Sequence, residues 1–145
     1  MVRAAMERDF ALPAARIAVA GLNPHAGEGG TMGREEEDMI APLIARLRAE
    51  GGWRLTGPHS ADTLFHEAAR ETYDVAVCMY HDQALVPIKT LEFAGGVNET
   101  LGLPFVRTSP DHGTALDIAG TDRADPTSTT AALRLAHDMA RARAA

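Results

Sequence analysis

The sequence feature that most constrains the fold is a short apolar run that ends abruptly in polar residues. The clearest case is the run 75–79, which is followed by Tyr80, His81, Asp82 and Gln83. An uninterrupted apolar run of this length predicts a strand buried on both faces. Because ligands bind beyond the carboxyl ends of the strands in an open parallel α/β sheet, the His-Asp-Gln cluster predicts a functional site.

Two further segments repeat this pattern. The run 16–22 leads into the glycine-rich stretch 23–33, and the run 104–108 leads into the polar stretch 109–120. The glycines of the first stretch allow tight turns, but Met32 stands where the third glycine of a G-x-G-x-x-G motif would be. That stretch therefore does not predict a dinucleotide-binding turn. It does not predict a phosphate-binding P-loop either, because no Gly-Lys-Ser/Thr sequence follows.

Helical patterns alternate with these runs. The sequence predicts helices over 1–11, 34–50, 60–72 and 125–144, further strands at 53–56 and 97–101, and a turn at 57–58. Pro42 predicts that the helix over 34–50 is kinked or begins later than residue 34. We expect a single α/β domain over 1–145, built as a three-layer α/β/α fold. Its sheet is expected to be mixed, since the segments near 97–108 are short and close together.

Composition excludes several function classes. The chain has 145 residues and a net charge of −6, without a basic run, which argues against a nucleic-acid partner. Residues 1–10 are charged and lack a signal core, and the apolar runs are too short to cross a membrane, so we expect a cytoplasmic protein. Cys78 is the single cysteine, which excludes an internal disulfide.

Histidines follow the ends of three apolar runs, at positions 25, 81 and 112. Imidazole with a neighbouring carboxylate is the usual ligand set for zinc or another divalent metal, and Asp82 or Glu28 could complete or orient it. The alternative is that His25 and His112 only hydrogen-bond turns. A metal-dependent hydrolase using His25, His81 and Asp82 is also chemically allowed.

Two cations and an amide emerge from similar positions. Lys89 and Arg107 follow apolar runs and could bind a phosphate or carboxylate, although each could equally be an ordinary surface cation. Asn98 lies in a strand-like context and could be a structural hydrogen-bonding residue.

Several motifs together carry a more specific resemblance. In order, they are Leu22-Asn-Pro-His-Ala-Gly-Glu-Gly-Gly30, Met79-Tyr-His-Asp-Gln83, Gly95-Gly-Val-Asn98, Thr100-Leu-Gly-Leu-Pro-Phe-Val-Arg-Thr-Ser109 and Asp111-His-Gly-Thr-Ala115. From Arg16 onward the chain resembles the C-terminal part of the 4-hydroxythreonine-4-phosphate dehydrogenase family of pyridoxal phosphate (vitamin B6) biosynthesis.

The resemblance implies an NAD-dependent oxidation of 4-phosphooxy-L-threonine, followed by loss of carbon dioxide to give 3-amino-2-oxopropyl phosphate. A divalent metal such as zinc, magnesium or cobalt is implied. The implied metal ligands are His25 and His81, and the implied substrate contacts are Lys89, Asn98 and Arg107. Two residues are the catalytic candidates. Asp82 could orient a ligand or handle a proton, and Lys89 could neutralise the charge of the substrate.

The stretch 112–120 resembles the nucleotide-binding loop of isopropylmalate and isocitrate dehydrogenases. This resemblance implies NAD contacts at His112, Gly113, Asp117 and Ile118, and it places His112 beside NAD rather than on the metal.

The resemblance also implies an incomplete site. Family members are about twice as long, with two α/β lobes of the isocitrate dehydrogenase-like fold, and the N-terminal lobe, which supplies a third metal histidine, is unmatched here. The family shares its active site across a homodimer, so a homodimer and a separate N-terminal lobe are the expected partners. Alternatives are a dehydrogenase of threonate or erythronate 4-phosphate, or a truncated non-catalytic remnant.

Overall fold

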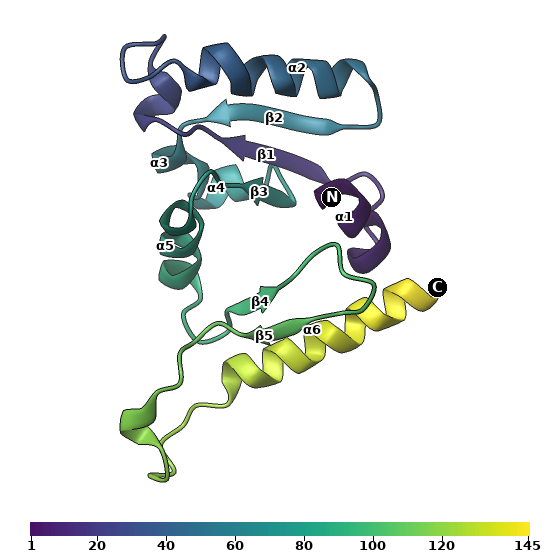
Figure 1. Cartoon of the computed structure of the whole chain (residues 1–145), viewed down its shortest axis with the longest axis vertical. Helices are drawn as coiled ribbons and strands as arrows, with labels where there is room; N and C mark the ends of the chain where they lie inside the picture. The colour runs from purple at the N-terminus through teal and green to yellow at the C-terminus, as the bar shows by residue number, and fades with distance from the viewer. The chain divides into compact units, whose positions relative to one another are not determined.

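The computed structural model describes all residues from 1 to 145, and the chain divides into two compact units (Figure 1). The parallel-sheet unit comprises Ala14–Pro87, and the hairpin unit comprises Met1–Pro13 together with Ile88–Ala145. The predicted α/β class is confirmed, because each unit combines strands with helices. The single domain over 1–145 stays a prediction.

The parallel-sheet unit is built around strand β1 (Arg16–Ala20). It pairs in parallel with β2 (Arg54–His59) on one side and with β3 (Val75–Val77) on the other. Residues 17–20 of β1 are buried, whereas all three residues of β3 are only half-buried. The prediction that the run 75–79 is buried on both faces is therefore wrong, because β3 is an edge strand.

The helices of this unit depart from the predicted ranges, and proline explains the departures at Pro42 and Pro87. The predicted helix over 60–72 is instead two short helices, which are separated at Phe65 and His66. The helical elements of this unit are the 3₁₀ turn η1 (Pro24–Gly27), the π-helical turn η2 (Glu36–Ile40), and helices α2 (Ala41–Ala49), α3 (Ala61–Leu64) and α4 (Glu67–Arg70). The later beginning predicted from Pro42 is confirmed, since α2 has this proline in its first turn, where the missing N–H costs nothing. Helix α5 (His81–Leu91), which crosses the boundary between the units, was not predicted because Pro87 lies inside it. None of the helices combines the length and the apolar composition that spanning a bilayer requires.

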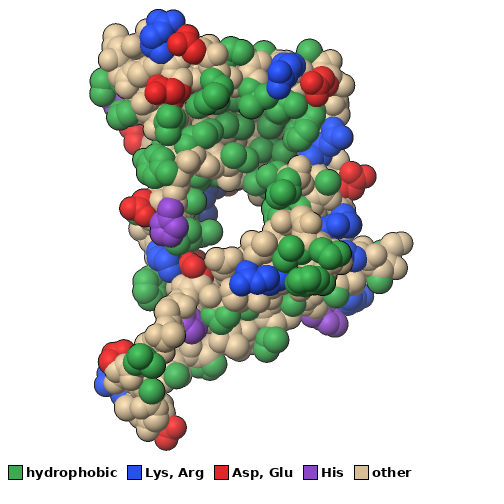
Figure 2. Space-filling model, viewed as in Figure 1, with side chains coloured by type: hydrophobic (Ala, Val, Ile, Leu, Met, Phe, Trp, Pro, Cys, Tyr) green, Lys and Arg blue, Asp and Glu red, His purple; other side chains and the backbone are tan.

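The core of the parallel-sheet unit packs against both faces of β1. Ala18 and Ala20 lie on one face and pack with Leu64 of α3. Because side chains alternate along a strand, Ile17 lies on the other face beside its neighbour Leu55 of β2. Helix α2 lies along β2, and apolar side chains gather over this part of the surface (Figures 1 and 2). The predicted turn at 57–58 is wrong, since these residues continue β2.

The hairpin unit contains a second, separate sheet. Its elements are α1 (Val2–Phe10), the end of α5, β4 (Val97–Glu99), β5 (Thr108–Pro110), the 3₁₀ turn η3 (Leu116–Ile118) and α6 (Thr127–Ala144). Strands β4 and β5 pair antiparallel with each other and do not join the parallel sheet. The prediction of one mixed sheet is therefore wrong, because the short segments near 97–108 satisfy each other's backbone groups as a hairpin.

A buried carboxylate ties the two ends of the hairpin unit together. Asp9 of α1 is 1% exposed and accepts hydrogen bonds from Arg8 (2.6 and 2.9 Å) and from Nε of Arg143 in α6 (2.7 Å). These hydrogen bonds hold the pKa of the Asp9 carboxyl far below its usual range. The ion pairs thus fix α1 against α6.

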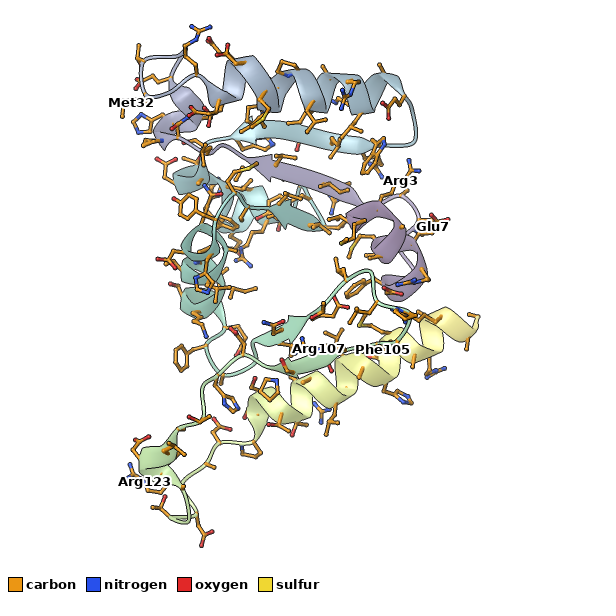
Figure 3. The ribbon with its side chains drawn as sticks, viewed as in Figure 1. Arg3, Glu7, Met32, Phe105, Arg107 and Arg123 are labelled. Atoms are coloured by element: carbon orange, nitrogen blue, oxygen red, sulfur yellow. The ribbon has the colours of Figure 1, made fainter.

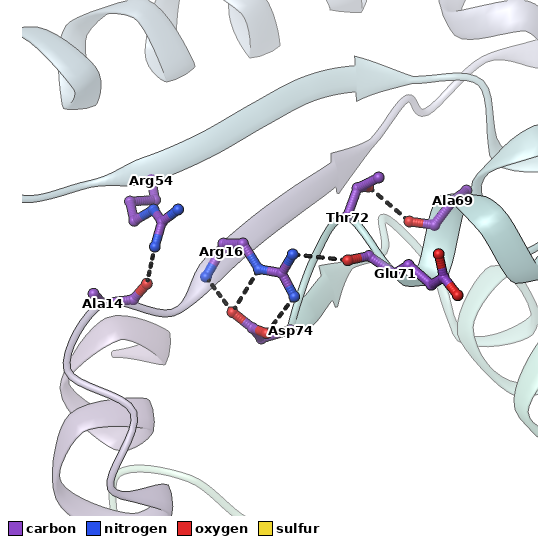
Figure 4. Close-up of polar contacts among 7 residues, drawn as sticks. All are labelled: Ala14, Arg16, Arg54, Ala69, Glu71, Thr72 and Asp74. Atoms are coloured by element: carbon purple, nitrogen blue, oxygen red, sulfur yellow. Dashed lines mark hydrogen bonds and ion pairs between the residues drawn. The ribbon is translucent and has the colours of Figure 1, made fainter.

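A second carboxylate fixes the amino ends of β1 and β3. Asp74 accepts hydrogen bonds from the backbone N–H of Arg16 (2.7 Å) and from its guanidinium (2.8 and 3.2 Å), and Nη1 of Arg16 also donates to the carbonyl of Glu71 (2.7 Å; Figure 4). The Arg16 guanidinium and backbone N–H lower the pKa of the Asp74 carboxyl to about 2.

Replacing Asp74 by Asn is expected to lower the free energy of unfolding near neutral pH by about 1 kcal/mol, because the ion pair with Arg16 is partly exposed. Since the folded pKa is depressed, this stabilisation is present above about pH 4 and is lost as the pH falls toward about 2. Urea unfolding across that range is expected to show a steeper acid loss for the parent than for Asp74→Asn. Equal slopes for the two proteins would contradict the assignment.

Candidate metal and substrate site

A hollow of about 270 Å³ opens at the carboxyl ends of the three parallel strands. Its lining comes from the segments after β1, β2 and β3, namely Leu22, Asn23, Pro24, His25, Ser60, Ala61, Asp62, Tyr80 and Gln83. The chain leaves β1 toward β2 on one side, while β3 lies on the other, so the hollow lies at the kind of switch point where α/β sheets bind ligands. The segments that follow the runs 16–22 and 75–79 therefore meet at this hollow.

His25 lies in a turn with an unusual backbone. The φ angles of His25, Ala26 and Glu28 are 52°, 51° and 44°, so three residues that are not glycine adopt the left-handed conformation. Each such residue costs about 1 kcal/mol, and the turn therefore depends on contacts that hold it in place. The His25 side chain is 61% exposed, and its Nδ1 lies 3.3 Å from Oε2 of Glu28.

The buried carboxylate of Glu36 provides such contacts. Its Oε1 accepts hydrogen bonds from the backbone N–H groups of Leu22 and Asn23 (2.7 Å each), and its Oε2 accepts one from Nδ2 of Asn23 (2.9 Å). Burial raises the pKa of Glu36, but the hydrogen bonds from Asn23 and Leu22 outweigh burial and leave the pKa below its ordinary value. Glu36 is 3% exposed, so an ionised side chain lies in the interior beneath the turn.

The role of Glu36 was not predicted from the sequence. A signal was nevertheless present. Glu36 precedes Ile40 by four residues and Ile44 by eight, so it falls on the apolar stripe of the helix, and all three residues are buried. An acidic residue on a core-facing stripe requires internal hydrogen-bond donors.

His81 begins helix α5 directly after Tyr80, which lines the hollow, but His81 is not itself a lining residue. Its Nδ1 lies 2.7 Å from Oδ1 of Asp82, and both side chains are exposed. The next residue, Gln83, is 8% exposed and donates from Nε2 to the carbonyl of Gly21 (2.8 Å) while its Oε1 accepts from the N–H of Met79 (2.7 Å). Gln83 therefore joins the segment that follows β1 to the segment that follows β3.

The two imidazoles have the donor chemistry that a divalent metal requires. In each, Nδ1 faces a carboxylate, which leaves Nε2 as the nitrogen that can bind a metal. Within either unit, no three His, Cys, Asp or Glu side chains are grouped as a complete ligand set. His25 and His81 thus each offer one nitrogen of the kind that binds a divalent metal.

Asp62 is a further acid at the hollow that sequence reasoning did not select. The Ser60 hydroxyl donates to Oδ1 of Asp62 (2.6 Å). This hydrogen bond lowers the pKa of the Asp62 carboxyl, and the nearby His25 lowers it further. Its position depends on the loop after β2, and no motif pointed to it.

In the hairpin unit, Lys89 is held by Asp111. The Lys89 Nζ lies 2.9 Å from both Oδ2 and the backbone oxygen of Asp111, and 5.5 Å from the centroid of the Phe93 ring. Asp111 is itself fixed, because its N–H donates to Oγ of Ser128 (3.1 Å). Sequence reasoning missed Asp111 because its pairing with Lys89 joins segments 22 residues apart.

Asn98 and Arg107 lie on the same face of the β4–β5 hairpin. Asn98 pairs with Ser109, and Arg107 precedes Ser109 by two residues, so both side chains point to the side opposite Thr108. Thr108 faces α6, donating to the carbonyl of Ala132 (2.9 Å). Arg107, which extends from the hairpin in Figure 3, is exposed. It donates from Nη1 to Oγ1 of Thr100 (2.7 Å). The hairpin therefore presents an amide and a guanidinium together.

The residues predicted to contact NAD lie in the connection between β5 and α6. Asp117 and Ile118 belong to η3, and of the four residues His112, Gly113, Asp117 and Ile118 only the last is half-buried. Nδ1 of His112 lies 2.9 Å from the carbonyl oxygen of Gly113.

Comparison with known proteins decides the family. A family model described as "Pyridoxal phosphate biosynthetic protein PdxA" matches residues 1–136. The chain belongs to the PdxA family. A 4-hydroxythreonine-4-phosphate dehydrogenase of Paracoccus denitrificans (strain Pd 1222) is 69% identical over 137 residues, which are 94% of this chain and 42% of that protein.

Solved structures of two dehydrogenases match this fold. A 4-hydroxythreonine-4-phosphate dehydrogenase from Klebsiella pneumoniae matches with a TM-score of 0.75 and 47% identity, over 98% of this chain and 43% of that one. A terephthalate 1,2-cis-dihydrodiol dehydrogenase from Burkholderia xenovorans LB400 matches with a TM-score of 0.65 and 32% identity, over 94% and 43% respectively. This PdxA family member therefore spans less than half the length of the relatives it matches.

Two glycines of the His25 turn give a matched test of how tightly this PdxA segment packs. Gly27 and Gly29 both have positive φ (84° and 62°), but a Cβ at Gly27 would lie 2.8 Å from Oε2 of Glu36, whereas a Cβ at Gly29 would meet nothing within 4 Å. Gly27→Ala is expected to lower the free energy of unfolding by about 3 kcal/mol and Gly29→Ala by about 1 kcal/mol. Equal losses in urea unfolding would show that the turn does not pack on Glu36.

Proposed function

We propose that this chain is the C-terminal part of an NAD-dependent and divalent-metal-dependent 4-hydroxythreonine-4-phosphate dehydrogenase, with one lobe of an isocitrate dehydrogenase-like fold. The reaction would oxidise 4-phosphooxy-L-threonine and release carbon dioxide, giving 3-amino-2-oxopropyl phosphate for vitamin B6 biosynthesis. The observation that carries the proposal is the pair of imidazoles after β1 and β3, His25 and His81, each with a carboxylate at Nδ1. The 69% identity to a relative of that name supports it.

Metal binding is assigned to Nε2 of His25 and of His81. The carboxylate on the opposite ring nitrogen fixes the tautomer that leaves Nε2 free, as in many metal sites. Further ligands are assigned to water and to a homodimer partner or a separate N-terminal lobe, because this chain groups no third side chain with the two histidines. Zinc, magnesium and cobalt are the candidate metals.

Substrate binding is assigned to Lys89, Asn98 and Arg107. After its two contacts with Asp111, the Lys89 ammonium retains an N–H that can bind the substrate phosphate or carboxylate. The Arg107 guanidinium has N–H groups beyond the one that Thr100 accepts, and planar guanidinium groups bind phosphate oxygens in pairs. His112, Gly113, Asp117 and Ile118 are assigned to NAD.

In the proposed reaction, a bound metal would polarise the substrate hydroxyl while NAD accepts the hydride. Asp82 holds the imidazole of His81 in one orientation and is the candidate acceptor for the proton of the hydroxyl. Lys89 neutralises negative charge on the substrate while the carboxylate leaves as carbon dioxide. Asp111 keeps the Lys89 ammonium in place for this role.

The alternative substrates are threonate and erythronate 4-phosphate, and the alternative to catalysis is a non-catalytic remnant. A similar solved chain from Burkholderia xenovorans is named for a dihydrodiol substrate, so related folds serve dehydrogenases with different substrates. The substrate is therefore a matter for direct assay.

The test is a chimera in which this chain replaces the matching segment of the Paracoccus denitrificans relative. With zinc or magnesium, the chimera is expected to reduce NAD with 4-phosphooxy-L-threonine. His81→Ala in the chimera is expected to lower kcat/KM by about 100-fold or more, because a metal ligand is lost. Lys89→Met is expected to act mainly by raising KM, because it removes charge that binds the substrate.

His137→Ala, which removes an exposed histidine of α6, is the matched control and is expected to leave kcat/KM unchanged. Turnover of erythronate 4-phosphate in preference to 4-phosphooxy-L-threonine would favour the alternative substrate. A folded chimera that turns over neither compound would favour the remnant. Full activity in His81→Ala would contradict the metal assignment.

A further inference from the structure

Two buried polar side chains of the parallel-sheet unit, Glu36 and Gln83, hydrogen-bond to one short segment, Gly21–Asn23, which leads from β1 to His25. We propose that Glu36 is a positioning residue for His25, with its carboxylate holding the turn that presents the imidazole to the hollow. This inference rests on the proposed function, in which His25 binds a metal.

The hydrogen bonds of Glu36 suit a carboxylate and no other side chain. Its two oxygens face donors only: the N–H groups of Leu22 and Asn23 at Oε1, and Nδ2 of Asn23 at Oε2. A glutamine in the same place would turn an NH₂ group toward one of these donors. Asn23 is not free to rotate in response, because its Nδ2 also donates to Oε2 of Glu35 (2.6 Å).

The backbone on both sides of His25 closes around the same carboxylate. A Cβ built at Gly21 would lie 3.0 Å from Oε1 of Glu36, and one built at Gly27 would lie 2.8 Å from Oε2. His25 lies between these two glycines, in the left-handed part of the turn. The carboxylate thus hydrogen-bonds to one end of the segment that carries the imidazole and packs against the other.

The control for this proposal lies at the opposite end of the same strand. Asp74→Asn also converts a hydrogen-bonded carboxylate into an amide, but it acts on the amino end of β1, through Arg16. A variant that merely loosens the sheet is expected to behave like Asp74→Asn. A variant that releases the His25 turn is expected to differ from it in the two measurements below.

The first measurement is amide hydrogen exchange in the metal-free chain. The N–H groups of Ala26 and Glu28 donate within the turn, to the carbonyls of Asn23 (3.1 Å) and His25 (3.2 Å). We expect Glu36→Gln to speed exchange at both amides by about 10-fold or more over Asp74→Asn, because the turn opens locally. The second measurement is titration with Co²⁺, where Glu36→Gln is expected to weaken binding by about 10- to 100-fold while Asp74→Asn leaves it unchanged.

Exchange rates at Ala26 and Glu28 that match those of Asp74→Asn would overturn the proposal, since Glu36 would then serve only stability. If Glu36→Gln does not fold, Glu36→Asp decides by the same criterion, because it keeps the charge but withdraws the oxygens from the turn. His25→Ala tests the metal assignment separately from the positioning role of Glu36. Unchanged Co²⁺ affinity in His25→Ala of the chimera, in which the N-terminal lobe is present, would refute the metal assignment, and the exchange rates would still decide the role of Glu36.

Discussion

The parallel-sheet unit depends on the burial of β1 between two parallel neighbours. Because β1 pairs on both sides, its carboxyl end emerges in the middle of the sheet edge, where the backbone loses its sheet partners while still buried. Buried N–H and carbonyl groups need partners, and both groups of the buried Gly21 have one. The Gly21 N–H donates to the carbonyl of His59, its carbonyl accepts from Gln83, and the next two N–H groups donate to Glu36. These hydrogen bonds hold the segment that leads to His25, and they thereby support the candidate site at this edge of the sheet.

Local patterns sufficed for much of the fold. The run 16–22 predicted β1, Pro42 predicted the later start of α2, and the helical pattern over 125–144 predicted α6. The errors arose where partners decide the outcome. The run 75–79 has the composition of a central strand, yet β3 pairs on one side only, and residues 81–91 form a helix despite an internal proline because tertiary contacts such as those of Gln83 hold its first turn.

For the candidate site, too, local patterns predicted some of the residues and missed others. Polar residues after apolar runs pointed to His25 and His81, since the carboxyl ends of parallel strands share one edge. The residues that support the site were not found, because each acts through a distant segment. Glu36 contacts the backbone 13 and 14 residues before it, and Asp111 holds Lys89 from 22 residues away. Such pairs become visible only when the chain is folded.

The central claim is that His25 and His81 bind one metal ion, and the most direct test is anomalous diffraction. Crystals of the chimera with the Paracoccus denitrificans relative, grown with zinc, would be measured at wavelengths on either side of the zinc absorption edge. The account predicts an anomalous peak bonded to Nε2 of both histidines. A peak held by other side chains, with His25 and His81 free in an active enzyme, would contradict it.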